Sequence, residues 1–380
     1  MNSSPPSSLQ LPSLRPSEKV QHFFEEQLLE GRGKSGARLP TIKEIARHLD
    51  VGVSTVQAVF ARLSSEGKVI MIPGKGTFLA DEKPMGASAS RAITVIIREH
   101  QLMGKESTWG KEICTSMLRE AANHPEGKMT IHPFFPENQK NLRQLLEEEA
   151  QRTAGAIIFP DPIGPMLAEP FEAAGRPVVH ITPSCPRATR DFVSPDFYGI
   201  CQKIGAGWRR LGRKRLAVLV HMPLSESATC TLSLAGLQAG FQEDEAWNGG
   251  RLDYRSLDMD DLKVSEAMES IFRRKPFPDA LYSTGDMIAA QAVEWLLARG
   301  IKVPEEVSII GGTGLHPAHG ALLPCTVIQQ PFERMGEEAV RMLVNRLRFD
   351  NASLPGRYLE VSIRPGRTTT EAETRCFGDA

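Results

Sequence analysis

A cluster of basic side chains near the amino terminus could contact the phosphates of DNA. Residues 32–75 carry a local charge of +5, whereas the net charge of all 380 residues is −1. The basic residues are Arg32, Lys34, Arg38, Lys43, Arg47, Arg62, Lys68 and Lys75, and the acidic ones are Glu44, Asp50 and Glu66. Phosphate contacts supply most of the sequence-independent affinity of duplex-binding proteins, so this segment predicts a DNA-binding surface. Because the net charge of the whole chain is close to zero, a protein that coats nucleic acid over its entire surface is excluded.

Three helices and a hairpin are predicted to present these basic residues. Apolar side chains recur at helical spacing over residues 18–31 and again over residues 53–67. Between them, Thr41 can cap a second helix, with Glu44 three residues later as its capping-box partner. Residues 68–79 read as a hairpin with a glycine-rich tip. This order predicts an α+β winged helix-turn-helix.

The same segment resembles the DNA-binding domain of GntR-type regulators over about 60 residues. The matching motifs are Leu39-Pro40-Thr41, Glu44-Ile45-Ala46, Val51, Val56, Arg62-Leu63, Glu66-Gly67 and Pro73-Gly74-Lys75-Gly76-Thr77-Phe78. The resemblance implies that the start of the third helix enters the major groove and that the wing reaches the minor groove. The DNA-binding candidates are therefore Arg38, Thr41, Lys43, Gly52, Val53, Ser54, Thr55, Gln57, Gly74, Lys75 and Gly76.

Two candidates depart from the family pattern. Many GntR members have arginine where this chain has Val53 and Gln57, so the arginine–guanine pairing is missing at both positions. Gln57 could instead pair with adenine, and Val53 could touch a thymine methyl group. In the wing, Gly74 and Gly76 are open to two interpretations, as hairpin-turn residues or as residues that let Lys75 approach DNA closely.

The remainder of the chain alternates short β-branched runs with helical patterns. Strands are predicted at 93–97, 156–159, 178–181, 216–220, 280–282 and 307–310, and helices at 111–122, 141–150, 199–211, 287–299 and 333–347. Strands buried on both faces and alternating with helices indicate parallel sheets with crossover connections. About 280 residues with this alternation of strands and helices predict two doubly wound α/β lobes rather than one large sheet.

These lobes resemble the effector domain of LacI/GalR-type repressors, which is periplasmic-binding-protein-like. The resemblance covers about residues 91–370 and is carried mainly by the segments 278–286, 300–311 and 326–331. It implies a ligand cleft between the lobes, with effector-binding candidates Trp109, Tyr198, Asp286, Thr313 and Gln330. Trp109 is equally open to a role in the core or an interface, and Asp286 to a role as a helix cap.

Departures at the cleft leave the effector class open. Gly285 stands where the family usually has Asn, Ser233 where many members have Arg, and Thr313-Gly314 replaces a common acidic pair. A pentose, a uronate, a nucleoside or another polar metabolite remains compatible, as does a sensor that binds nothing tightly. The domain order predicted is a flexible tail (1–16), the winged helix (17–80), a linker (81–90), the effector and dimerisation domain (91–370) and a second tail (371–380).

The sequence gives little support to an enzymatic function or to a metal site. Gly311-Gly312-Thr313-Gly314 lacks the Lys-Ser/Thr of a phosphate-binding loop, and His316 and His319 have no full set of metal ligands nearby. The six cysteines form no CxxC pair, and no secretion signal or membrane span is evident, which favours a cytoplasmic protein. We expect a homodimeric repressor that needs no cofactor, binds operator DNA and responds to a sugar-like metabolite. The alternative is a metabolic enzyme or solute-binding module whose winged helix serves protein contacts.

Overall fold

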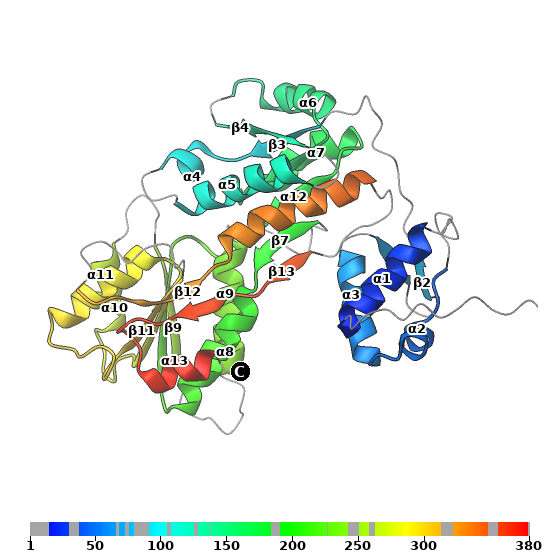
Figure 1. Cartoon of the computed structure of the whole chain (residues 1–380). Coiled ribbons are helices and arrows are strands. Elements are labelled where there is room, and N and C mark those ends of the chain that lie inside the picture. Colours follow the sequence, from blue (N-terminus) through cyan, green and yellow to red (C-terminus); the bar gives the residue numbers. More distant parts are fainter. Residues whose placement is uncertain are drawn as a thin grey trace, which may run out of the picture. The chain divides into compact units, whose positions relative to one another are not determined.

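The structure, a computed structural model, contains two compact units (Figure 1). The first comprises residues 1–89 and 341–355, and the second comprises 90–340 and 356–380. The residues described are 15–29, 38–65, 68–72, 76–79, 91–104, 108–124, 128–137, 139–183, 191–225, 227–241, 251–257, 263–312, 322–348 and 356–378. Within these ranges, no helix is long and apolar enough to cross a membrane.

The first unit is the predicted winged helix. Its elements are α1 (Pro16–Leu29), α2 (Ile42–Leu49), α3 (Val53–Ser65), β1 (Val69–Ile72) and β2 (Gly76–Leu79). The two strands form an antiparallel hairpin that pairs Val69 with Leu79 and Ile72 with Gly76. The three helices and the hairpin share a core of Val20, Phe24, Leu39, Ile45, Ala46, Val56, Val59, Phe60, Leu63, Val69 and Leu79. The apolar periods seen in the sequence therefore supply this core.

A capping box and a left-handed residue fix the turn between α2 and α3. The Thr41 backbone N–H donates to Glu44 Oε2 at 2.7 Å, and the Glu44 backbone N–H donates to Thr41 Oγ1 at 3.3 Å. At the other end of α2, Asp50 has φ 51° and ψ 56°, and its N–H bonds the Ala46 carbonyl. A left-handed residue ends a helix sharply, so α3 can start at Val53 after only a short turn.

The second unit contains two six-stranded sheets. One has the strand order β13-β7-β6-β5-β3-β4, and the other has β14-β12-β11-β10-β8-β9. The first sheet is built from β3 (Ala92–Ile96), β4 (Thr130–Phe134), β5 (Gly155–Ile158), β6 (Val178–Ile181), β7 (Phe192–Pro195) and β13 (Arg357–Leu359). The second is built from β8 (Arg215–Val220), β9 (Arg251–Ser256), β10 (Ala280–Ser283), β11 (Ser308–Gly311), β12 (Thr326–Gln329) and β14 (Ser362–Arg364). Every neighbouring pair is parallel except β12 with β14, which confirms the doubly wound lobes.

Helices connect these strands and cover the sheets. They are α4 (Glu99–Met103), α5 (Thr108–Asn123), α6 (Leu142–Arg152), α7 (Gly164–Ala173), α8 (Phe197–Arg210), α9 (Ala228–Phe241), α10 (Val264–Ile271), α11 (Asp286–Leu297), α12 (Phe332–Arg348) and α13 (Glu371–Gly378). The contact between α8 and α9 is close, because Gly240 leaves room for the Gln202 carbonyl: a Cβ at Gly240 would lie 1.9 Å from that oxygen. The α8–α9 layer covers one face of the second sheet, and α10 and α11 cover the other.

The segment predicted as a second tail, 371–380, is instead helical over Glu371–Gly378 and forms α13. Phe377 is buried against Trp208 of α8, with ring centroids 5.8 Å apart. Hydrophobicity alone misses this helix, because its other anchor is a buried carboxylate. Glu373 is only 1% exposed, so its charge needs partners inside the lobe.

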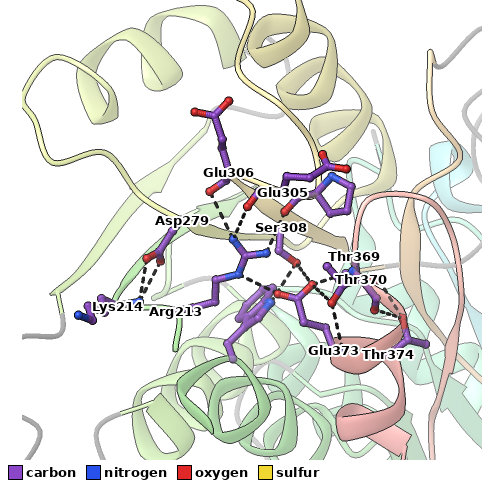
Figure 2. Close-up of polar contacts among 12 residues, drawn as sticks. Arg213, Lys214, Asp279, Glu305, Glu306, Ser308, Thr369, Thr370, Glu373 and Thr374 are labelled. Atoms are coloured by element: carbon purple, nitrogen blue, oxygen red, sulfur yellow. Dashed lines mark hydrogen bonds and ion pairs between the residues drawn. The ribbon is translucent and has the colours of Figure 1, made fainter. Parts of the chain in front are cut away.

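Those partners come from three separate segments (Figure 2). Arg213 Nε donates to Glu373 Oε1 at 2.8 Å, and the Ser308 hydroxyl donates to Oε2 at 3.1 Å. The Thr370 backbone N–H and hydroxyl also donate to Oε2, at 2.7 and 3.0 Å. Arg213 further donates to the carbonyls of Pro304, Glu305 and Glu306. This network ties α13 to the second lobe.

The chain passes between the two sheets at neighbouring points. One passage follows β7 and leads into α8, a second leads from β12 through α12 to β13, and a third leads from β13 to β14. The first and third passages are hydrogen-bonded to each other, since the Asp196 N–H donates to the Leu359 carbonyl at 2.9 Å. Short paired crossovers of this kind are typical of lobes that open and close by a hinge motion.

Candidate functional site

The start of α3 presents the predicted base-contacting residues to solvent. Val53 is 43% exposed, Gly52, Ser54 and Gln57 are exposed, and Thr55 is half-buried. The opposite face of the same helix is buried in the core of the first unit. An exposed helix start with a buried back face has the form that the second helix of a helix-turn-helix needs to enter a major groove.

The other predicted DNA-binding residues lie beside the wing and at the start of α2. Arg38, Thr41 and Lys43 are all exposed. The backbone of Arg38 forms an isolated antiparallel β-bridge with Phe78 of β2. The Leu39 N–H donates to the Thr77 carbonyl at 2.8 Å, so the chain before α2 is fixed to the wing. Gly74, Lys75 and Thr313 lie outside the described residues, whereas Gly76 begins β2. The DNA contacts of these residues stay a prediction.

The strand orders locate the ligand-binding edges of the two lobes. In each sheet, the strand that comes first along the chain lies between the next two: β3 lies between β4 and β5, and β8 lies between β9 and β10. The strand order therefore reverses between β3 and β5 in one sheet and between β8 and β10 in the other. In doubly wound folds, ligands bind outside the carboxyl ends of the strands at such a switch point. The side chains that follow these four strands are therefore the candidates to inspect.

An ion pair occupies the switch point of the first lobe. Arg98 follows β3 and Asp161 follows β5, and the guanidinium donates to the carboxylate at 2.7 Å (Nε to Oδ2) and 3.1 Å (Nη2 to Oδ1). The Asp161 side chain is 4% exposed and that of Arg98 is 31% exposed. The hydrogen bond to Asp161 raises the pKa of Arg98. Sequence reasoning missed this pair, whose only signal was its position after two buried strands.

Trp109 lies at the same edge. It is the second residue of α5, is half-buried, and its ring is tilted against Phe159 with centroids 5.8 Å apart. Phe159 directly follows β5. Trp109 is thus available for stacking on a ligand while also packing on a core aromatic residue, so both interpretations of this tryptophan remain compatible with the structure.

A buried hydrogen-bonded cluster occupies the switch point of the second lobe. His221 follows β8 and Thr284 follows β10, and His221 Nδ1 lies 2.7 Å from Thr284 Oγ1. The Cys230 sulfur lies 3.8 Å from the same imidazole nitrogen. Burial lowers the pKa of His221 from its ordinary value, which favours the neutral imidazole. These three residues were not predicted, although two of them occupy the strand ends where a ligand site is expected.

Two of the predicted effector residues reach this edge of the second lobe. Asp286 is the half-buried first residue of α11, and its Oδ1 lies 3.1 Å from the place a Cβ of Gly311 would occupy. The N-cap of α11 is Gly285, so Asp286 does not occupy the capping position. Gln330 follows β12 and its amide donates to the Gly312 carbonyl at 3.2 Å.

The remaining family positions fall elsewhere. Tyr198 is 40% exposed in the first turn of α8, next to the crossover that follows β7. Ser233 is fully buried in α9 and lies 3.3 Å from the Tyr282 hydroxyl, which donates to it. Ser233 therefore belongs to the core of the second lobe.

Comparison with known families supports both units. Residues 16–79 match the family described as "Bacterial regulatory proteins, gntR family", and residues 209–369 match "Periplasmic binding protein-like domain". The first match coincides with the winged helix, and the second begins in α8 and covers most of the second lobe.

Named relatives are transcriptional regulators. The chain is 23% identical over 350 residues to the arabinose metabolism transcriptional repressor of Geobacillus stearothermophilus, covering 84% of this chain and 88% of that protein. It is 29% identical over 195 residues to the regulator CelR of Thermobifida fusca, covering 49% of this chain and 54% of that protein. In this second alignment, the chain thus spans about half the length of its relative.

Solved structures share the fold. A lac repressor dimer bound to operator and an anti-inducer superposes with a TM-score of 0.60 at 19% identity, covering 74% of this chain and 95% of that chain. A CelR–cellobiose complex superposes with a TM-score of 0.58 at 19% identity, covering 87% of this chain and all of that chain. The chain thus joins a segment that matches the GntR family, in the winged helix, to a segment that matches the periplasmic-binding-protein-like domain, in the second unit, and its full-length layout is similar to that of the arabinose metabolism transcriptional repressor.

Proposed function

We propose that the protein is a sequence-specific DNA-binding transcriptional repressor controlled by a small polar metabolite, a sugar or sugar derivative. The observation that carries the proposal is the joining, in one chain, of an exposed helix-turn-helix start to a two-lobed unit with polar side chains at both switch points. The first feature suits a major groove, and the second suits a ligand with several hydroxyl groups.

The effector site combines charged and neutral groups. Arg98 and Asp161 at one lobe, and Asp286, Gln330 and Thr284 at the other, supply donors and acceptors that a polyol can satisfy. A half-buried tryptophan at the first lobe can stack on a sugar ring. Closure of the lobes on the ligand is a hinge motion, and its two states give the DNA-binding domains two arrangements.

The partners follow from this function. Operator half-sites related by two-fold symmetry call for a homodimer, and a regulator of chromosomal DNA belongs in the cytoplasm. The relatives are regulators, and we propose that this chain likewise carries no enzymatic activity of its own. The alternative, an enzyme or solute-binding module whose winged helix contacts proteins, predicts no salt-dependent binding to duplex DNA.

Operator binding tests the first half of the proposal. Selection from a pool of random DNA duplexes with the full chain should yield a preferred binding site. Gln57→Ala should weaken binding to that site by about 1–3 kcal/mol, while binding to unrelated duplex DNA barely changes. Gln139→Ala, an exposed glutamine in the second unit, serves as the control. Failure to select any site, together with binding that does not depend on salt, would exclude the DNA-binding function.

Ligand screening tests the second half. A ligand at 100 times its Kd should add about 2.7 kcal/mol to the stability of the native state, so sugars, uronates, polyols and nucleosides are screened by thermal denaturation. Asp286→Ala should abolish the shift without changing operator affinity, whereas Glu294→Ala, an exposed carboxylate of the same helix, should keep it. A shift that survives in Asp286→Ala would remove Asp286 from the effector site.

A further inference from the structure

A basic pocket lies on the second lobe, along its edge strand β9 and beside the start of β8. The pocket has a volume of about 230 Å³. Its polar lining consists of Arg215, Asp253, Arg255, Ser270, Arg273 and Arg274. Arg215 is the first residue of β8, and His221 of the effector edge follows the last one. Six strand residues at about 3.3 Å each separate Arg215 from His221 by roughly 20 Å. Arg255 lies nearer the carboxyl end of its strand, but its guanidinium donates to Ser270 in the last turn of α10, so we treat the pocket as separate from the effector site.

The strand register explains how charged side chains gather there. Asp253 of β9 pairs with Ala217 of β8, and Arg255 pairs with Leu219. Ala217 and Leu219 point into the core cluster that contains α10 and α11, so their partners on the edge strand project to the same side. There they meet the carboxyl-terminal end of α10, which provides Ser270 and is followed by two further arginines.

Most of the positive charge in the pocket has no partner among the residues that the structure describes. Arg255 donates to Ser270 Oγ at 3.3 Å and to the Tyr254 carbonyl at 2.8 Å. Within the described ranges, the guanidinium groups of Arg215, Arg273 and Arg274 make no hydrogen bond or ion pair. Four arginines against one aspartate give the lining a net charge of +3. Like charges held together repel, and a bound anion would offset that repulsion.

Purely structural explanations account for only parts of this cluster. Inward-pointing charges protect an edge strand from pairing with other chains, which covers Asp253 and Arg255 of β9 but not the loop after α10. Cations near a helix carboxyl terminus interact favourably with its dipole, which covers Arg273 and Arg274 but not Arg215 of a strand. Neither explanation requires arginines from two strands and a loop to line one cavity.

We propose that this pocket binds the phosphate group of a small anionic metabolite, as a second ligand site separate from the effector site. Guanidinium groups present planar pairs of donors that match phosphate oxygens, and several of them can bind one phosphate. The cavity is smaller than the roughly 300–1,000 Å³ of pockets that hold drug-sized molecules, so the ligand is a compact one. Inorganic phosphate and a phosphomonoester share the required chemistry.

The test uses the full chain and inorganic phosphate as the probe. Binding is measured by isothermal titration calorimetry at constant ionic strength, with chloride as the balancing anion. The double variant Arg273→Gln/Arg274→Gln should weaken binding at least tenfold, because hydrogen bonds to charged groups contribute strongly. Both side chains are exposed, so the variant is expected to fold. The matched control is Arg375→Gln, an exposed arginine of α13 in the same lobe.

A parallel titration with glycerol 3-phosphate identifies the source of the phosphate. Tighter binding of glycerol 3-phosphate that is also lost in the double variant indicates a phosphomonoester ligand, and equal affinities indicate phosphate itself. The proposal is overturned if neither probe gives saturable binding at concentrations up to about 10 mM, because a site with a weaker Kd than that would bind too little ligand to have an effect. Equal affinities of the double variant, the Arg375→Gln control and the parent chain would overturn it as well.

Discussion

Removing the charge of Glu373 should destabilise the second unit by about 3 kcal/mol. The Glu373 side chain is 2% exposed and that of its partner Arg213 is 13% exposed, so Glu373→Gln leaves a largely buried guanidinium without its counter-ion. Breaking a buried ion pair from one side costs roughly 3–5 kcal/mol. The lower end applies here because Arg213 keeps hydrogen bonds to the carbonyls of Pro304, Glu305 and Glu306.

Urea denaturation followed by tryptophan fluorescence measures this loss in the full chain. All four tryptophans lie between residues 90 and 340, so the signal reports on the second unit and not on the winged helix. Glu371→Gln makes the same charge change at an exposed position of α13 and should alter the free energy of unfolding by less than about 0.5 kcal/mol. The double variant Glu373→Gln/Arg213→Met should lose less than the sum of the single variants, since the two side chains interact directly. If Glu373→Gln is as stable as Glu371→Gln, the ion pair does not hold α13 in place.

Three further predictions concern single positions. Burial lowers the pKa of His180 to about 4, whereas in the unfolded chain the imidazole binds a proton near pH 6.5. The free energy of unfolding should therefore fall by about 3 kcal/mol as the pH drops from 6.5 to 4, and His180→Gln should reduce this dependence on pH. Gly240→Ala places a Cβ 1.9 Å from the Gln202 carbonyl and should cost about 1–3 kcal/mol in urea denaturation, whereas Gly378→Ala, with open space around it, should be neutral. Thr41→Ala removes the cap of α2 and should lower the stability of the winged helix by about 1 kcal/mol, measured by hydrogen exchange of the α2 amides; unchanged exchange would show that the cap contributes nothing.

Local signals explain why the winged helix could be predicted closely. The capping box at Thr41 and Glu44, the apolar periods and the glycine-rich hairpin tip all act within a few residues of one another. Six of the buried strands, β3, β5, β6, β8, β10 and β11, were predicted from their apolar, β-branched runs, whereas the buried strands β7 and β12 were not predicted. Strand β9 was missed since its sequence, RLDYRS, places charged residues on the side facing α10.

The site was harder to predict because its pairs are remote in sequence. Arg98 and Asp161 are 63 residues apart, and so are His221 and Thr284. Each pair forms only because the strand order places two non-consecutive strands side by side, and no local pattern encodes that order. Family resemblance pointed to Asp286, which lies at the same edge of the second sheet as His221 and Thr284, but it gave no indication of those two residues.

The late strands of the chain give its synthesis on the ribosome a particular order. The first sheet receives its last strand from residues 357–359, and the second receives an edge strand from residues 362–364. The winged helix has been synthesised by residue 79, and at roughly 5–20 residues per second the ribosome needs about 14–56 s more to reach residue 357. During that interval the nascent chain carries a DNA-binding domain without a complete sensor. A message truncated before residue 357 would therefore encode a winged helix whose attached lobes both lack a strand.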